Sequence, residues 1–226
     1  STAVRWQLIT TNPALIARTP RAEPHQHKVP DLDTVKAIIA VADPRMATVI
    51  RLAIATGARR GELGALKWSD IDIENRLITF QRSVVDGGPV SQVKPTKTRT
   101  TGVVSVGEAT MASVEAWRAH QAAASEKAGI GLLEADGWVF PSRDWGHPIT
   151  LNQITQDWRT LADAHGLEGV RFHDLRHATA THLIANGTDI RTVAGRLRHA
   201  SPTMTLDVYA ARTTAADQVA GDLIDR

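Results

Sequence analysis

The only tyrosine of the chain, Tyr209, lies ten residues after His199 and follows a histidine–arginine pair, His173 and Arg176. A tyrosine is a poor nucleophile because the pKa of its phenol is about 10. It becomes reactive when a neighbour takes its proton and cations stabilise the charge that develops on the electrophile. Histidine and arginine can do both at a phosphate, so this stretch predicts a phosphate-attacking site. The alternative is that Tyr209 is an ordinary helix residue with a half-buried ring.

A second candidate is the stretch T-G-A-R-R-G-E-L, which covers residues 56–63. Gly57 is expected to end a buried helix, and Arg59 stands at the turn into the next helix, where free backbone amides favour an anion. The planar guanidinium can hold two phosphate oxygens at once. Glu62, three residues later, is expected to orient Arg59. The alternative is an exposed Arg–Glu pair that contributes only tenths of a kcal/mol.

A third candidate is the basic turn K-P-T-K-T-R, from Lys94 to Arg99. If a phosphate lay beside this turn, Lys97 could protonate a leaving oxygen. The alternative is a solvated hairpin tip.

The spacing of His173 and His177 also matches the pair of zinc ligands in the H-E-x-x-H peptidases, with His199 as a third ligand. The second position is here Asp174, a shorter acid than the glutamate that serves as the base in those enzymes. A zinc hydrolase would leave the tyrosine, the first arginine and the hairpin lysine without a role.

These residues must be positioned by a fold of 226 residues, which is enough for one large domain. Hydrophobic residues make up 42% and charged residues 22%, which is ordinary for a globular protein. The net charge is only +2, although the pI of about 9.2 is basic. Cysteine is absent, which excludes disulfides and thiolate zinc sites, and no apolar run approaches the roughly 20 residues of a membrane span. We therefore expect a soluble, intracellular protein.

The periodicity predicts a mainly α (α+β) fold with one small three-stranded antiparallel sheet. Asp31 or Asp33 is expected to cap the first core helix, and Asp43 before a proline to cap the second. Helices are predicted at 31–42, 43–57, 60–66, 107–127, 151–165, 173–185, 189–198, from 201 onward and at 215–224. Strands are predicted at 77–85, 90–93 and 100–106.

Four signatures occur in a fixed order: T-G-A-R-R-G-E-L, K-T, H-D-L-R-H, and L-R-H-A-S followed by the tyrosine. Their order and spacing resemble the catalytic domain of the tyrosine recombinases, the phage-integrase family. The resemblance implies that the catalytic residues are Arg59, Lys97, His173, Arg176, His199 and Tyr209. It implies supporting roles for Glu62 and His177, and DNA contacts by Arg60, Lys94, Arg99 and Arg198. The sequence departs from the family at Arg198, because many members have glycine there.

The resemblance also implies a mechanism. Tyr209 would attack a DNA phosphodiester, with His173 as the proton acceptor and Lys97 as the proton donor to the leaving 5′ oxygen. The product would be a 3′-phosphotyrosine that keeps the bond energy for religation. Phosphoryl transfer needs mainly positioning and charge stabilisation, which two guanidinium groups can supply, so no metal and no cofactor is implied.

The resemblance further implies a division of the chain. Residues 1–30 would be the end of an otherwise missing N-terminal core-binding domain plus a linker, and residues 31–212 the catalytic domain. Residues 213–226 would form a C-terminal helix that docks on a neighbouring subunit. The expected partner is double-stranded DNA, on which a free monomer would assemble into a homotetramer. No membrane partner is expected, and the location would be the bacterial cytoplasm, at the nucleoid.

Two other functions share these residues. A type IB topoisomerase has similar chemistry but relaxes supercoils, and the short C-terminal helix favours the recombinase over it. A catalytically inactive DNA-binding relative is the other alternative, and the complete set of catalytic residue types argues against it.

Overall fold

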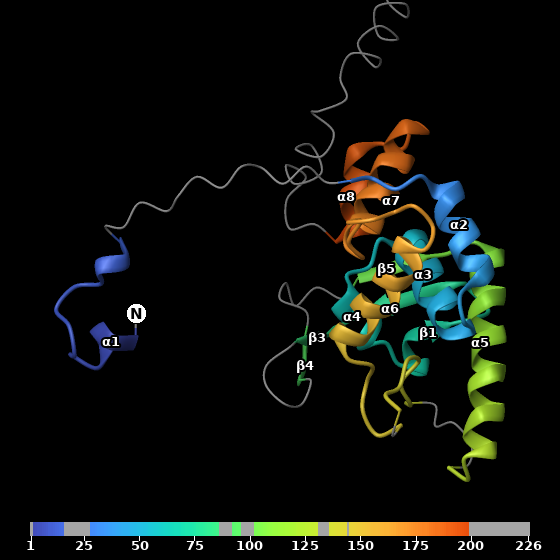
Figure 1. The fold of residues 1–226 in the computed structure, drawn as a ribbon, viewed down its shortest axis with the longest axis horizontal. Coiled ribbons are helices and arrows are strands. Elements are labelled where there is room, and N and C mark those ends of the chain that lie inside the picture. The colour runs from blue at the N-terminus through green and yellow to red at the C-terminus, as the bar shows by residue number, and fades with distance from the viewer. Residues whose placement is uncertain are drawn as a thin grey trace, which may run out of the picture.

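The computed structural model describes residues 2–15, 28–85, 92–95, 102–130, 136–143 and 145–198. Within these ranges the chain is mainly helical, with short antiparallel strands, which confirms the predicted fold class (Figure 1). The α-helices are α1 (Thr2–Arg5), α2 (Leu32–Val41), α3 (Pro44–Thr56), α4 (Arg60–Gly64), α5 (Glu108–Lys127), α6 (Leu151–Asp163), α7 (Asp174–Ala185) and α8 (Ile190–Leu197). The 3-10 helices are η1 (Pro13–Leu15) and η2 (Trp68–Asp70). The strands are β1 (Ile71–Asp72), β2 (Leu77–Phe80), β3 (Arg82–Val85), β4 (Gln92–Pro95) and β5 (Gly102–Ser105).

The helix ends follow the predicted capping chemistry. The side chain of Asp31 accepts hydrogen bonds from the first backbone amides of α2, and that of Asp43 does the same for α3, whose first residue is Pro44. Helix α3 ends at Gly57, which adopts the left-handed conformation with φ of 61°. Both predicted caps and the predicted helix end are therefore confirmed.

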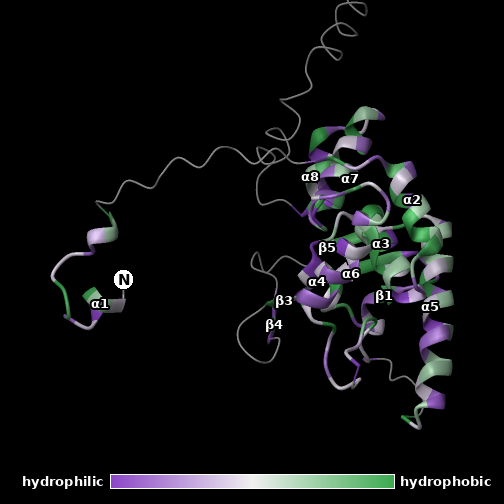
Figure 2. Ribbon diagram, viewed as in Figure 1, coloured by the Kyte–Doolittle hydropathy of each residue, from purple (hydrophilic) through white to green (hydrophobic). Residues whose placement is uncertain are grey.

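Helix α3 forms the centre of the core. It contacts α2, α5, α6 and α7, and its residues Val49, Ile50 and Leu52 are fully buried. Figure 2 shows hydrophobic residues gathered on α3 and on the helix faces turned toward it. The hydroxyl of Thr179 on α7 donates to the carbonyl of Ile54 on α3, at 2.9 Å. The end of α3 is thus held against α7, the helix that carries the predicted H-x-x-R pair.

The strands pair differently from the prediction. The predicted strand 77–85 is broken at Gln81 into β2 and β3. Strand β2 pairs with β1 and β5 in a three-stranded antiparallel sheet, while β3 pairs with β4 in a separate two-stranded ladder. The third strand of the sheet is therefore β1, which was not predicted, and the predicted strand 90–93 belongs to the ladder.

The buried side chain of Asp70 explains the break. Its Oδ1 accepts a hydrogen bond from the Gln81 side chain at 2.7 Å, and its Oδ2 pairs with the guanidinium of Arg82. A buried carboxylate must be paired and hydrogen-bonded. Two consecutive residues are therefore drawn toward η2 at the point where the chain changes strand partners.

None of the described residues 2–15 is buried. Helix α1 ends at Arg5, and Trp6 and Leu8 are 69% and 71% exposed. Residues 16–27 of the predicted linker lie outside the described residues. No helix in the described part of the chain is long and apolar enough to cross a membrane.

Candidate active site

Three of the six predicted catalytic residues, Arg59, His173 and Arg176, lie in the described part of the chain. The supporting residues Glu62 and His177 lie there too. Outside the described residues lie Lys97, Arg99, His199, Tyr209 and the predicted C-terminal helix.

Arg59 is positioned by the turn between α3 and α4. Gly57 approaches α8 so closely that a Cβ on it would lie 2.1 Å from Cδ2 of Leu197. Arg59 then caps α4 in an extended conformation, and its side chain is 41% exposed. The predicted turn after Gly57 thus leaves a guanidinium accessible beside the start of a helix.

Glu62 is the buried partner of two arginines. Its Oε1 accepts from Nη1 of Arg59 at 2.9 Å, and its Oε2 accepts from the Arg59 backbone amide at 3.0 Å and from Nη2 of Arg198 at 2.8 Å. Its side chain is only 4% exposed. Burial by itself raises the pKa of Glu62, but the charge of Arg198 and the hydrogen bonds from both arginines outweigh burial, and the pKa is lowered. Glu62 is therefore an ionised carboxylate that holds Arg59 in place.

Arg176 lies on α7 and is buried. Its Nη1 donates to the carbonyl of Gly57 and its Nη2 to the carbonyl of Leu197, at the ends of α3 and α8. Burial, together with the charges of Arg59 and Arg198, lowers its pKa to about 9, although Glu62 opposes the shift. It therefore remains a cation at neutral pH.

His173 caps α7, and its ring packs edge-on against that of His177, with a centroid distance of 5.2 Å. Arg176 follows His173 by less than one helical turn, so both side chains leave α7 near its start. In the described ranges, no group of three or more histidine, aspartate or glutamate side chains is placed to hold a metal ion.

A cavity of about 570 Å³ joins the α4 end of this arrangement to the α7 end. Arg59 and His173 line it together with Arg60, Thr155 and Arg171, and the backbone stretch between Arg171 and His173 contributes Phe172. Nη1 of Arg60 donates to the hydroxyl of Thr155 on α6 at 2.6 Å. The structure thus brings Arg59, Arg60 and His173 to one cavity, while Arg176 is not among the lining residues.

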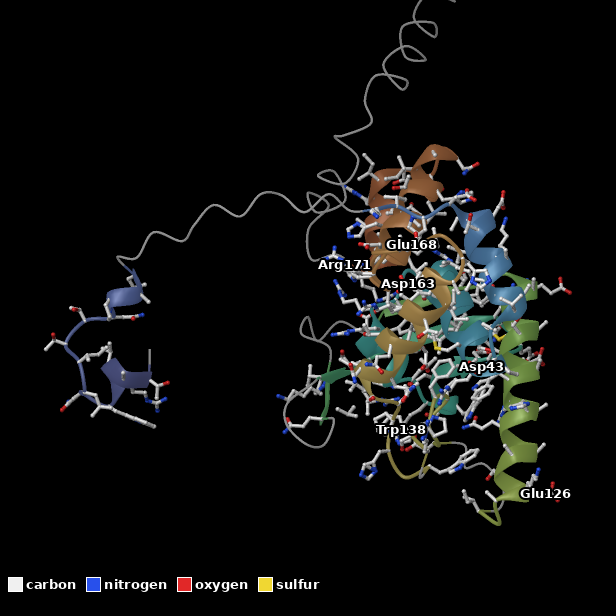
Figure 3. All side chains as sticks on the ribbon, viewed as in Figure 1. Asp43, Glu126, Trp138, Asp163, Glu168 and Arg171 are labelled. Atoms are coloured by element: carbon white, nitrogen blue, oxygen red, sulfur yellow. The ribbon has the colours of Figure 1, made fainter. Side chains whose placement is uncertain are left out.

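Sequence reasoning missed Thr155 and Arg171. Arg171 lies just before α7 (Figure 3). Its guanidinium pairs with the buried carboxylate of Asp174 at 3.3 Å. A basic residue two positions before His173 was a signal that the sequence offered. Thr155 offered none, because its position beside Arg60 is set by the packing of α6 on α4.

Two further described residues that were predicted to contact DNA, Lys94 and Arg198, do not line the cavity and differ in exposure. Lys94 lies on β4 and is exposed. Arg198 ends α8, and its side chain is only 10% exposed because it turns inward to Glu62. The predicted phosphate contact by Arg198 remains a prediction.

The family model described as "Phage integrase family" matches residues 29–215. The chain belongs to the phage integrase family. A tyrosine recombinase XerC-like protein of Caldanaerobacter subterraneus is 27% identical over 183 residues, which cover 75% of this chain and 46% of that protein. The ICEBs1 integrase of Bacillus subtilis is 30% identical over 164 residues, which cover 72% of this chain and 44% of that protein. The chain thus spans about half the length of these two curated relatives.

Solved structures share the fold. The Tn1549 transposon integrase in complex with transposon right end DNA superposes with a TM-score of 0.73 at 17% identity, covering all of this chain and 75% of that chain. A λ integrase dimer bound to a core site gives a TM-score of 0.58 at 19% identity, covering 92% of this chain and 54% of that chain.

Proposed function

We propose that this chain is the strand-cleaving and strand-joining part of a site-specific DNA recombinase. The observation that carries the proposal is that Arg59 and Arg198 both bind the buried carboxylate of Glu62, and that Arg176 is close enough to feel the charges of all three. Among these four side chains two positive charges are unbalanced. A site with such an excess favours a phosphodiester anion, and the forked guanidinium groups match its non-bridging oxygens.

The proposed reaction follows from the residue types. Arg59 and Arg176 hold the non-bridging oxygens of one DNA phosphate, and His199 adds a hydrogen bond. The phenol oxygen of Tyr209 bonds to phosphorus as the bond to the 5′ oxygen breaks. His173 takes the phenol proton, and the hairpin lysine at position 97 gives a proton to the departing oxygen.

The exposure of Arg59 and the burial of Arg176 support different parts in this reaction. Arg59 lines the cavity and can meet the phosphate directly. Arg176 holds the backbone at Gly57 by a hydrogen bond to its carbonyl oxygen. Two of the five N–H groups of Arg176 are used in this way, on the carbonyl oxygens of Gly57 and Leu197. The remaining donors and the charge are what it offers to the phosphate.

We propose that the reaction needs no metal. The transition state of phosphoryl transfer requires charge stabilisation and alignment, and two guanidinium groups can supply both. Proton transfer is assigned to histidine and lysine, so no metal-bound water is needed as a base.

The proposed partner is double-stranded DNA, with a homotetramer assembling on it through the C-terminal helix of residues 213–226. The names of the relatives, which are recombinases and integrases, favour strand exchange over relaxation of supercoils. Such a protein would work at the nucleoid of a bacterial host.

Covalent trapping tests the proposal. The protein is mixed with a nicked suicide half-site, from which the cleaved end diffuses away, and the protein–DNA adduct is measured on a denaturing gel. A 3′-linked adduct is expected with the natural sequence and none with Tyr209→Phe. An adduct that persists in the Tyr209→Phe variant, or its absence with the natural sequence on the cognate site, contradicts the proposal.

A further inference from the structure

The strongest unexplained feature is the conformation of Arg198. It ends α8 in the left-handed region, with φ of 56° and ψ of 45°. Glycine is the residue favoured at such a helix end, since a side chain is strained there. The contacts of the Arg198 side chain can offset this strain.

The path of the Arg198 side chain is confined on both sides. Its Cζ lies 4.3 Å from the centroid of the Phe80 ring on β2. On strand β5, a Cβ added to Gly102 would come within 2.1 Å of Cδ of Arg198 and 2.7 Å of its Cγ. The three atoms nearest to that added Cβ all belong to Arg198, so the missing side chain of Gly102 makes room for Arg198.

The side chain ends on Glu62. Nη2 of Arg198 donates to Oε2 at 2.8 Å, and Nη1 donates to the carbonyl of Arg196 at 3.0 Å. Both partners of the ion pair are buried, with side-chain exposures of 10% and 4%. A buried ion pair is little screened by solvent, and removing one partner leaves the other as an uncompensated buried charge.

We propose that Arg198 is a positioning residue that keeps Arg59 available for the phosphate. Glu62 is shared by the two arginines, with one guanidinium group on each carboxylate oxygen. Without Arg198, the whole charge of the carboxylate would fall on Arg59 and hold its guanidinium in the ion pair. With Arg198 present, the guanidinium of Arg198 neutralises part of the carboxylate charge. Glu62 then orients Arg59 without cancelling the positive charge that Arg59 offers to the phosphate.

The position of Arg198 in the chain gives it a second influence on the site. The residue that follows it is His199, so the left-handed turn at Arg198 sets the direction in which the chain leaves α8. The contact with Glu62 therefore ties the exit of α8 to the start of α4. This inference rests on the proposed function, and it differs from a direct DNA contact because the guanidinium is turned away from solvent.

The first test replaces Arg198 by glycine, which keeps the left-handed turn and removes only the side chain. Single-turnover cleavage of a suicide half-site at saturating DNA is expected to slow roughly ten- to hundredfold, as for a misplaced catalytic group. Half-saturation by DNA and its salt dependence are expected to stay within about twofold, because no phosphate contact is lost. Arg191→Ala, which removes an exposed arginine from the same helix, is the matched control.

Two results would overturn the positioning role. One is an unchanged cleavage rate in Arg198→Gly. The other is weaker DNA binding with a salt slope smaller by about 1, which marks a lost phosphate contact. Arg198→Lys separates charge from shape: it is expected to recover only part of the rate, since lysine lacks the planar fork.

The second test does not depend on DNA cleavage. Gly102→Ala is expected to lower the melting temperature of the natural protein and to be tolerated in Arg198→Gly, where the gap is empty. An equal loss in both backgrounds would show that Arg198 does not pass over Gly102 and would overturn the inference. If the natural sequence forms no covalent adduct while this coupling is found, the proposed function fails and the contact itself stands.

Discussion

Gly57 at the end of α3 packs directly against Leu197 at the end of α8. A Cβ on Gly57 would lie 2.1 Å from Cδ2 of Leu197. Gly57 also has φ of 61°, so both space and backbone conformation demand glycine there. We expect Gly57→Ala to lower the free energy of unfolding by roughly 2 to 4 kcal/mol. Urea denaturation measures this loss.

Gly166→Ala is the control for that substitution. Gly166 also has a positive φ, of 74°, but nothing lies within 4 Å of an added Cβ. The Gly166→Ala variant should therefore lose only about 1 kcal/mol of the free energy of unfolding, from backbone strain. Equal losses at both positions would show that the contact with Leu197 contributes nothing.

Glu62→Gln is expected to destabilise the protein by roughly 3 kcal/mol at pH 7, because it leaves buried arginines without their counter-charge. The pKa of Glu62 is lowered on folding, so its stabilisation is complete above the unfolded pKa, about 4.3, and is lost as the pH falls through the folded value. The difference between the natural protein and the variant should therefore shrink below about pH 5. Urea unfolding at several pH values measures it, with Glu115→Gln as an exposed control on α5. A difference independent of pH would contradict an ionised Glu62.

Arg59→Lys and Arg176→Lys keep the charge and remove the planar fork. Each is expected to slow single-turnover cleavage by roughly a hundredfold or more, comparable to losing an oxyanion donor. Arg176→Lys also loses the paired contacts with the carbonyls of Gly57 and Leu197. Arg159→Lys, on the exposed side of α6, should cleave normally. Near-normal cleavage by either active-site variant would show that bidentate contact is unnecessary.

Chelation should leave cleavage unchanged. The expected rate in excess EDTA equals that in buffer, because the proposed reaction uses no metal at the phosphate. Half-site cleavage before and after dialysis against EDTA is the measurement. Loss of activity that zinc restores would revive the metal hypothesis built on His173 and His177.

Removing residues 213–226 should separate cleavage from assembly. The sequence predicts an apolar stripe on a short helix there, formed by Ala215, Ala216, Val219, Ala220, Leu223 and Ile224. A helix of this length needs a protein surface to be stable. Truncation in the full-length protein is expected to keep half-site adducts and to lose recombination between two full sites. Recombination at the natural rate would rule out docking on a neighbour.

Local chemistry made the helices predictable. Asp31, Asp43 and Gly57 act within a few residues of themselves, so their roles follow from the sequence alone. The pair of Arg59 and Glu62 was predictable for the same reason, since the two residues lie three positions apart at the start of α4.

Contacts between distant segments were not predictable. The break at Gln81 depends on Asp70, which is buried only after η2 has packed. The inward turn of Arg198 depends on Gly102 and Glu62, which lie about a hundred residues or more before it in the chain. A basic residue beside a predicted phosphate site is naturally interpreted as a DNA contact, and only tertiary packing could show that its guanidinium is buried.

The arginine cluster around Glu62 has a consequence for the resting protein. Burial lowers the pKa of Arg176, and the charges of Arg59 and Arg198 lower it further while Glu62 opposes the shift, so three positive charges share a single carboxylate. An anion that binds beside these arginines is expected to offset their mutual repulsion and to stabilise the folded state in proportion to its binding. The excess positive charge that is proposed to bind the DNA backbone would thus also make the stability of the fold depend on bound anions.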